Sequence, residues 1–199
     1  MKKSLFRQFI ALLLIPVCII LVINFCIIIH LHKSQNEELK NYCISTLENI
    51  NVNVSSMTTS MKKTATVFSS QKETQAYLES SSSDSHQLQR QSYSELIGMA
   101  QSYTPGLIDI LMWDQTSVTS LISYIPADME DFVVNQFQDS RNDTASYFRF
   151  YIQPATDTPY MIYFAPIYLT SFSENFGKYI GNIAIICKTN ALYKLVNLS

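Results

Sequence analysis

The chain begins with a long, unbroken run of apolar residues, Phe9 to Leu31, that contains no charged side chain. About 20 such residues in a helix cross a hydrocarbon core of about 30 Å. A cleaved secretory signal has a shorter core of about 7–15 apolar residues and ends at small residues, and no such site lies between Asn24 and Lys33. The pattern therefore predicts a retained transmembrane helix over residues 9–32.

After this run, apolar positions recur in alternating steps of four and three. Such steps place side chains on one face of a helix, and neither Pro nor Gly occurs between Lys33 and Ser80. We predict one long helix within residues 33–80, from about 35 to about 78, that can continue the membrane helix. Its apolar face must be covered by a folded domain, by a second copy of the helix, or by each along different lengths. The series is Cys43, Leu47, Ile50, Val54, Met57, Met61, Thr64 and Phe68.

Residues 81–199 mix both periodicities. A polar break at 80–85 precedes a second helix, capped by Asp84 or Ser85, which "TPG" at 104–106 ends. Two short β-branched runs, Leu107–Trp113 and Val118–Tyr124, predict a β-hairpin. A proline and early acids in "PADMEDFVVNQFQ" predict a helix, and its apolar positions are Met129, Phe132, Val133 and Phe137.

Three further strands are expected in "ASYFRFYIQ", "YMIYFAPIYLT" and "KYIGNIAIICK", with Pro166 marking an edge or bulge in the second of them. A short helix capped by Thr189 or Asn190 follows. Consecutive strands joined by short turns form antiparallel sheets. We therefore predict an α+β domain with about five strands and helices over one face.

Charge sets the expected orientation. Lys2, Lys3 and Arg7 precede the apolar run, whereas the segment after it is mixed. Cationic flanks stay in the cytoplasm, so residues 1–8 are expected inside and those after about 33 outside. Three of the 14 Lys and Arg residues precede the run. The segment after the run therefore holds 11 Lys and Arg and 16 Asp and Glu, which gives it a net charge of −5. This balance favours neither nucleic acid nor anionic lipid as a partner.

Sequence signatures of catalysis or metal binding are missing. His30, His32 and His86 show no zinc-ligand spacing, and neither a nucleophile elbow nor a Gly-rich phosphate loop occurs. We expect no enzyme, no metal and no cofactor. Cys43 and Cys187 are the two cysteines outside the membrane run; an extracytoplasmic setting permits their pairing, but their spacing supports it weakly.

Several pieces, in this order, resemble the Cache sensory domains of bacterial signalling proteins. They are "LLLIP", the Ser/Thr/Asn-rich helix, "DILMWD" and "GKYIGNIAIICKTNALYKLV". The likeness is to the extracytoplasmic part of YesM-type histidine kinases, which act in two-component systems, and of membrane-bound AraC-type regulators. It implies a PAS-like fold over 81–199 packed with the long helix. The matching positions in the closing segment are Gly177, Gly181, Ile183, Ile185, Leu192 and Leu195.

The resemblance also implies a small-molecule site on the sheet. In such a site the guanidinium of Arg149 can clamp a carboxylate. The alternative is that Arg149 faces outward while Phe148 and Phe150 are buried, because strand side chains alternate. The order and spacing of Trp113, Tyr124 and Arg149 differ from those of amino-acid-binding Cache domains, so amino-acid binding is not inferred. The candidate ligand-binding residues are Trp113, Tyr124, Arg149, Tyr151 and Tyr163.

We thus expect the extracytoplasmic ligand-sensing region of a transmembrane signalling protein, forming a homodimer through the long helix and contacting no nucleic acid. Its output module is not encoded here, so we expect either a fragment or the product of an interrupted reading frame. The alternative is a membrane-anchored surface protein with a helical stalk and no ligand.

Overall fold

The computed structural model describes residues 2–79, 93–114, 117–122, 125–139, 145–170 and 176–189. The chain forms two compact units, Met1–Asn51 and Val52–Ser199. The predicted beginning of the second helix at 84–85 and the predicted helix after Thr189 lie outside the described residues.

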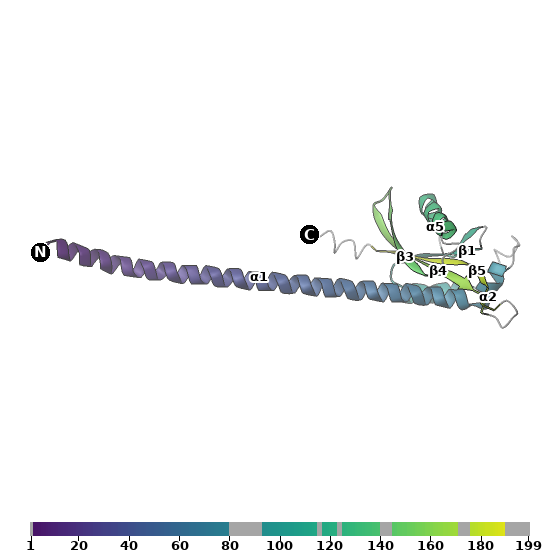
Figure 1. The fold of residues 1–199 in the computed structure, drawn as a ribbon, viewed down its shortest axis with the longest axis horizontal. Helices are drawn as coiled ribbons and strands as arrows, with labels where there is room; N and C mark the ends of the chain where they lie inside the picture. Colours follow the sequence, from purple (N-terminus) through teal and green to yellow (C-terminus); the bar gives the residue numbers. More distant parts are fainter. Residues whose placement is uncertain are drawn as a thin grey trace. The chain divides into compact units, whose positions relative to one another are not determined.

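Helix α1, Lys2–Ser70, contains the described residues of the first unit and continues into the second (Figure 1). Among the described residues it is the one helix long and apolar enough to cross a membrane. Its apolar 18-residue window has a mean hydropathy of 2.0 and is entirely unburied. A helix that is apolar all round and covered by nothing in its own chain suits lipid better than water.

The long helix ends earlier than the sequence predicted, at Ser70, and α2, Lys72–Glu79, follows. Local hydrogen bonds explain the break. The Ser69 and Ser70 hydroxyls donate to carbonyls three residues back, which competes with helix continuation. Gln75 Nε2 then donates to the Ser69 carbonyl oxygen at 3.1 Å, so a carbonyl at the end of the helix gains a side-chain partner.

The second unit is α+β, as predicted. Its five antiparallel strands lie in the order β2-β1-β5-β4-β3, so β5 is central. Helix α4, Ser94–Tyr103, precedes the sheet, and α5, Ala127–Asp139, lies between β2 and β3 in the chain. The strands are β1 Leu107–Trp113, β2 Val118–Ser120, β3 Tyr147–Gln153, β4 Thr158–Tyr168 and β5 Tyr179–Lys188.

Strand β2 is shorter than predicted because a side chain takes over its pairing. The register of β1 against β5 shifts between Leu107 and Asp109, and the buried Asp109 carboxylate accepts hydrogen bonds from its neighbours. One oxygen accepts from the backbone N–H of Ile110 at 2.7 Å and of Ile122 at 3.0 Å; the other accepts from the Ser120 hydroxyl. Regular ladder pairing therefore stops at Ser120.

Helices cover both faces of the sheet, whereas the sequence predicted one covered face (Figure 1). On one face α1, α2 and α4 pack on alternate strand residues such as Ile110, Tyr163 and Ile185. On the other, α5 packs on the intervening residues, including Leu111, Ile162 and Ile186. We call these the α1-side core and the α5-side core.

The apolar stripe of the long helix divides at about residue 54. Met57, Met61 and Phe68 are buried in the α1-side core. Toward the N-terminus Leu47 is 65% exposed and Cys43 is also exposed. The sheet domain therefore covers one half of the stripe and leaves the other half uncovered within the chain.

Gly181 allows β1 and β5 to approach closely. A Cβ added here would lie inside van der Waals contact of the Trp113 carbonyl oxygen and 3.2 Å from the Leu78 side chain. Only glycine fits this point of the central strand, which is a physical reason for a glycine in the closing motif.

Candidate ligand-binding layer beneath helix α5

Helix α5 forms from local signals and folds onto the sheet through one face. Its first amides, those of Met129 and Glu130, donate to the Pro126 carbonyl at 3.0 Å, and Asp128 and Glu130 lie in the positive first turn. Met129, Val133 and Phe137, spaced by four, are buried against the strands. The helix is therefore an amphipathic cover over one face of the sheet.

Aromatic rings fill the layer between α5 and the strands. Trp113, 2% exposed, stacks on Phe137 with ring centroids 5.6 Å apart and planes inclined by 6°. Phe164 meets Phe137 edge-on at 5.5 Å and stacks on Tyr147 at 5.1 Å. Such geometries are favourable for aromatic pairs, so three strands and the helix share one aromatic cluster.

A polar seam joins α5 to β3 at the edge of this layer. The Tyr151 hydroxyl donates to Asp128 Oδ2 at 2.7 Å, and Arg149 Nε donates to Gln136 Oε1 at 3.2 Å. The Tyr147 hydroxyl donates to the Gln136 carbonyl at 3.3 Å. The Arg149 guanidinium also lies over the Tyr147 ring, 4.9 Å from its centroid, a favourable cation–π position. We call these five residues the α5–β3 seam.

The seam changes the acidity of one of its members. Burial raises the pKa of Tyr151 to about 12, assisted by the hydrogen bond to Asp128 and by the negative charge of that carboxylate. The ring also packs against Phe132 at 5.0 Å. Tyr151 therefore stays protonated, as a donor, throughout the physiological pH range.

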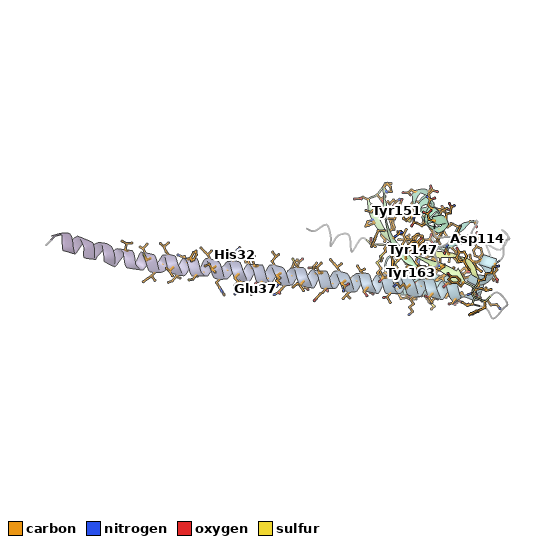
Figure 2. All side chains as sticks on the ribbon, in the orientation of Figure 1. His32, Glu37, Asp114, Tyr147, Tyr151 and Tyr163 are labelled. Atoms are coloured by element: carbon orange, nitrogen blue, oxygen red, sulfur yellow. The ribbon has the colours of Figure 1, made fainter. Side chains whose placement is uncertain are left out.

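The structure places three of the five predicted site residues on one face of the sheet. Trp113, Arg149 and Tyr151 all lie on the α5 face. Tyr163 lies on the opposite face, in the α1-side core, 4.7 Å from the Phe148 ring; Figure 2 shows it apart from Tyr151. Tyr124 lies outside the described residues.

Arg149 matches neither of its two sequence interpretations completely. It is exposed, as the outward-facing alternative required, yet its hydrogen bond is to α5. Phe148 is half-buried, but Phe150 is 69% exposed, so the expected buried pair of phenylalanines is wrong for Phe150. Phe150 is exposed because the α1-side core includes Phe148 but does not extend along β3 to Phe150.

Sequence reasoning missed the seam residues contributed by α5, and Tyr147 beside them. Asp128 had been interpreted as a helix-start acid, and Gln136 was not singled out. Their signal is spacing: Asp128, Phe132 and Gln136 follow one another by four residues, a single stripe on a helix. The facing β3 residues follow by two, as strand faces do.

The described residues contain no cluster of three or more His, Cys, Asp or Glu suited to a metal. All four cysteines are free thiols, so Cys43 and Cys187 are not bridged, and burial raises the pKa of Cys187 to about 12. A groove on α1 near His32 and Glu37 (Figure 2) lies along a single helix, which cannot enclose a ligand.

No protein-family model and no curated protein matches the sequence. Among solved structures, the isoleucine-bound sensory domain of the Campylobacter jejuni chemoreceptor Tlp3 is similar, with a TM-score of 0.49 and 11% identity over 76% of this chain and 57% of that one. The ligand-binding domain of the Pseudomonas aeruginosa chemoreceptor PctC, in complex with GABA, gives a TM-score of 0.48 and 11% identity over 81% and 65%. The chain thus spans less than two thirds of each of these domains, and the likeness is one of chain path.

Proposed function

We propose that this chain is the extracytoplasmic ligand-sensing region of a transmembrane signalling protein, with residues 9–32 in the membrane and the N-terminus in the cytoplasm. One observation carries the proposal: α1 contains both the apolar run and, at Met57, Met61 and Phe68, one wall of the α1-side core. A change in that core acts directly on the helix that enters the membrane.

The sheet supplies a route from a ligand to α1. Strands β4 and β5 direct alternate residues to opposite faces, with Ile162 and Ile186 toward α5 and Met161 and Ile185 toward α1. A ligand that displaces α5 must move these strands, and packed cores resist gradual deformation. The ligand shifts the equilibrium only by its differential affinity for the two arrangements.

We propose a small-molecule ligand with an apolar body and a charged or polar end. The aromatic cluster around Trp113 suits the body, and opening the α5–β3 seam releases Arg149 and Asp128 for the polar end. The guanidinium fork matches a carboxylate or phosphate, and the carboxylate matches a cation. An anionic ligand would therefore bind mainly through Arg149, and a cationic ligand mainly through Asp128.

The uncovered half of the α1 stripe supports a homodimer. Cys43 and Leu47 are exposed within the chain, and apolar residues at heptad-like spacing pack well against a second copy of the same helix. In the signalling proteins that the chain resembles, a histidine kinase or an AraC-type module follows the sensor. We propose an output of this kind.

The test is thermal unfolding of the full chain in detergent micelles, followed by the fluorescence of Trp113, its single tryptophan. A ligand at 100 times its Kd stabilises by about 2.7 kcal/mol, which raises the Tm by roughly 5–11 °C. Arg149→Gln should abolish the shift produced by an anionic ligand while lowering the unliganded Tm only slightly, because Arg149 is exposed and its contacts with Gln136 and Tyr147 contribute little stability at an exposed site. Lys62→Gln, near Phe148 on the other face, is the matched control.

If none of a broad set of small metabolites raises the Tm, direct sensing loses its support. The rival, a membrane-anchored structural protein with a helical stalk, then becomes the better account, and the exposed stripe favours it. The rival predicts that Leu47→Lys disrupts assembly while Arg149→Gln has no effect on any activity of the protein in cells.

A further inference from the structure

Strand β3 is an edge strand without the usual protection. It ends the sheet order, so no described strand pairs with its outer side. Its pairing with β4 is regular over all seven residues, whereas both ladders of β5 contain a register shift. Natural edge strands are usually short, bulged, or interrupted by Pro or charged side chains; "YFRFYIQ" has one charge, Arg149, whose Nε donates to Gln136 on α5.

The face of β3 on the α1 side presents exposed apolar side chains. Phe150 is 69% and Ile152 52% exposed, although both point to the face that holds the α1-side core. Phe148, two residues earlier, is half-buried in that core. Single exposed apolar residues are normal on a protein surface, but two adjacent ones on an unpaired edge indicate a surface that binds a partner.

We propose that β3 pairs antiparallel with β3 of a second copy of this chain, about a two-fold axis at Phe150. Opposite residues in an antiparallel pair share one face. This register places Phe150 opposite its own copy and Phe148 opposite Ile152, so one face of the junction is entirely apolar. On the other face Arg149 lies opposite Tyr151, and no like charges face each other.

Other registers that keep the faces matched fit less well. An axis at Arg149 sets two arginines directly opposite each other, which is destabilising. An axis at Tyr151 shortens the paired stretch and leaves Tyr147 without an opposite strand residue. The two-fold junction also limits extension of the sheet, since it uses both β3 edges, and the remaining edge strand, β2, has three residues.

The pairing has a consequence for the layer beneath α5. Tyr151 and Arg149 belong to the α5–β3 seam, so each seam would lie against the same residues of the other copy. The junction uses residues different from the exposed α1 stripe at Cys43 and Leu47. It therefore joins chains independently of any pairing through α1.

Cysteine crosslinking of the full chain in membranes tests both the junction and its register. The background carries Cys18→Ala, Cys26→Ala and Cys43→Ala; Cys187 is buried and stays. Opposed residues lie within disulfide reach, whereas two copies of residue 152 would be about 14 Å apart along the strands, beyond the limit of about 7 Å between Cα atoms. Mild oxidation should therefore give on the order of tenfold more disulfide dimer for Phe150→Cys than for Ile152→Cys.

Both positions are exposed, so equal Tm values under reducing conditions are expected and show that both variants fold. As a second measurement, Phe150→Asp in a Leu47→Asp background, which removes pairing through α1, should reduce the dimer recovered after amine crosslinking, while Met99→Asp in the same background, at an exposed position on α4, should not. No disulfide at residue 150, or as much at residue 152 as at residue 150, would overturn the proposal.

Discussion

A buried pair of hydroxyls offers a quantitative test of how α1 is fixed to the sheet domain. Thr64, the one polar member of the buried half of the stripe, and Thr104, the C-cap of α4, share a hydrogen bond of 2.9 Å and are both 0% exposed. Thr64→Val leaves the Thr104 hydroxyl buried without this partner, which costs about 1–3 kcal/mol. Replacing both by valine removes both polar groups and should be nearly neutral.

The assay is thermal unfolding in micelles, with Trp113 fluorescence as the probe. For a domain of this size, about 1–3 kcal/mol corresponds to a fall in Tm of roughly 2–12 °C. We expect each single variant to fall in this range and the double variant to recover most of the loss. If the double variant loses the sum of the two single losses, the hydroxyls are not partners and the packing of α1 described here is wrong.

Further variants test other parts of the structure. Gly181→Ala should destabilise the folded protein by about 1–3 kcal/mol through overpacking. Gly98→Ala, in an open helical position, should stabilise it by up to about 1 kcal/mol. Equal Tm changes for the two variants would contradict the close approach of β1 and β5. Met61→Ala should lower the free energy of unfolding by about 2–5 kcal/mol. Leu47→Ala should leave the Tm of monomers unchanged and weaken the dimers measured by crosslinking. A large loss of monomer stability for Leu47→Ala would contradict the divided stripe. Because the folded pKa of Tyr151 is raised to about 12 from 10, its stabilising effect is complete below pH 10 and is lost as pH rises from 10 to 12. Tyr151→Phe should flatten this part of the Tm-versus-pH curve, and an unchanged curve would contradict the seam.

The elements were largely predictable because their signals are local. Leu107–Trp113 was predicted with both ends as observed, since apolar alternation and the flanking "TPG" and "DQT" specify it. The same holds for the existence of α5, where a proline, early acids and four-residue spacing agree. Pro166 marks an edge as expected: the pairing of β4 with β3 ends at Phe164.

Tertiary relations were not predictable from these local patterns. The break at Gln71 has no Gly or Pro; it is accompanied by two hydrogen bonds between Gln75 and Thr170, which lies 95 residues later in the chain. Which face Tyr163 occupies depends on the β3–β4 register, and a one-residue shift would reverse it. The stripe predicted a covered surface, but only the folded domain determines which half is covered.

The proposed membrane attachment is through α1, and the expected orientation of this helix rests on charge alone. Labelling of Cys43 is the most direct measurement of that orientation. This thiol is exposed and follows the apolar run, while Cys187 is buried with a pKa raised to about 12. In intact cells a membrane-impermeant maleimide should label the wild-type chain once, and Cys43→Ala should abolish that labelling. Labelling of Cys43 in intact cells by a membrane-permeant maleimide but not by the impermeant one would place the domain in the cytoplasm and contradict the extracytoplasmic sensor.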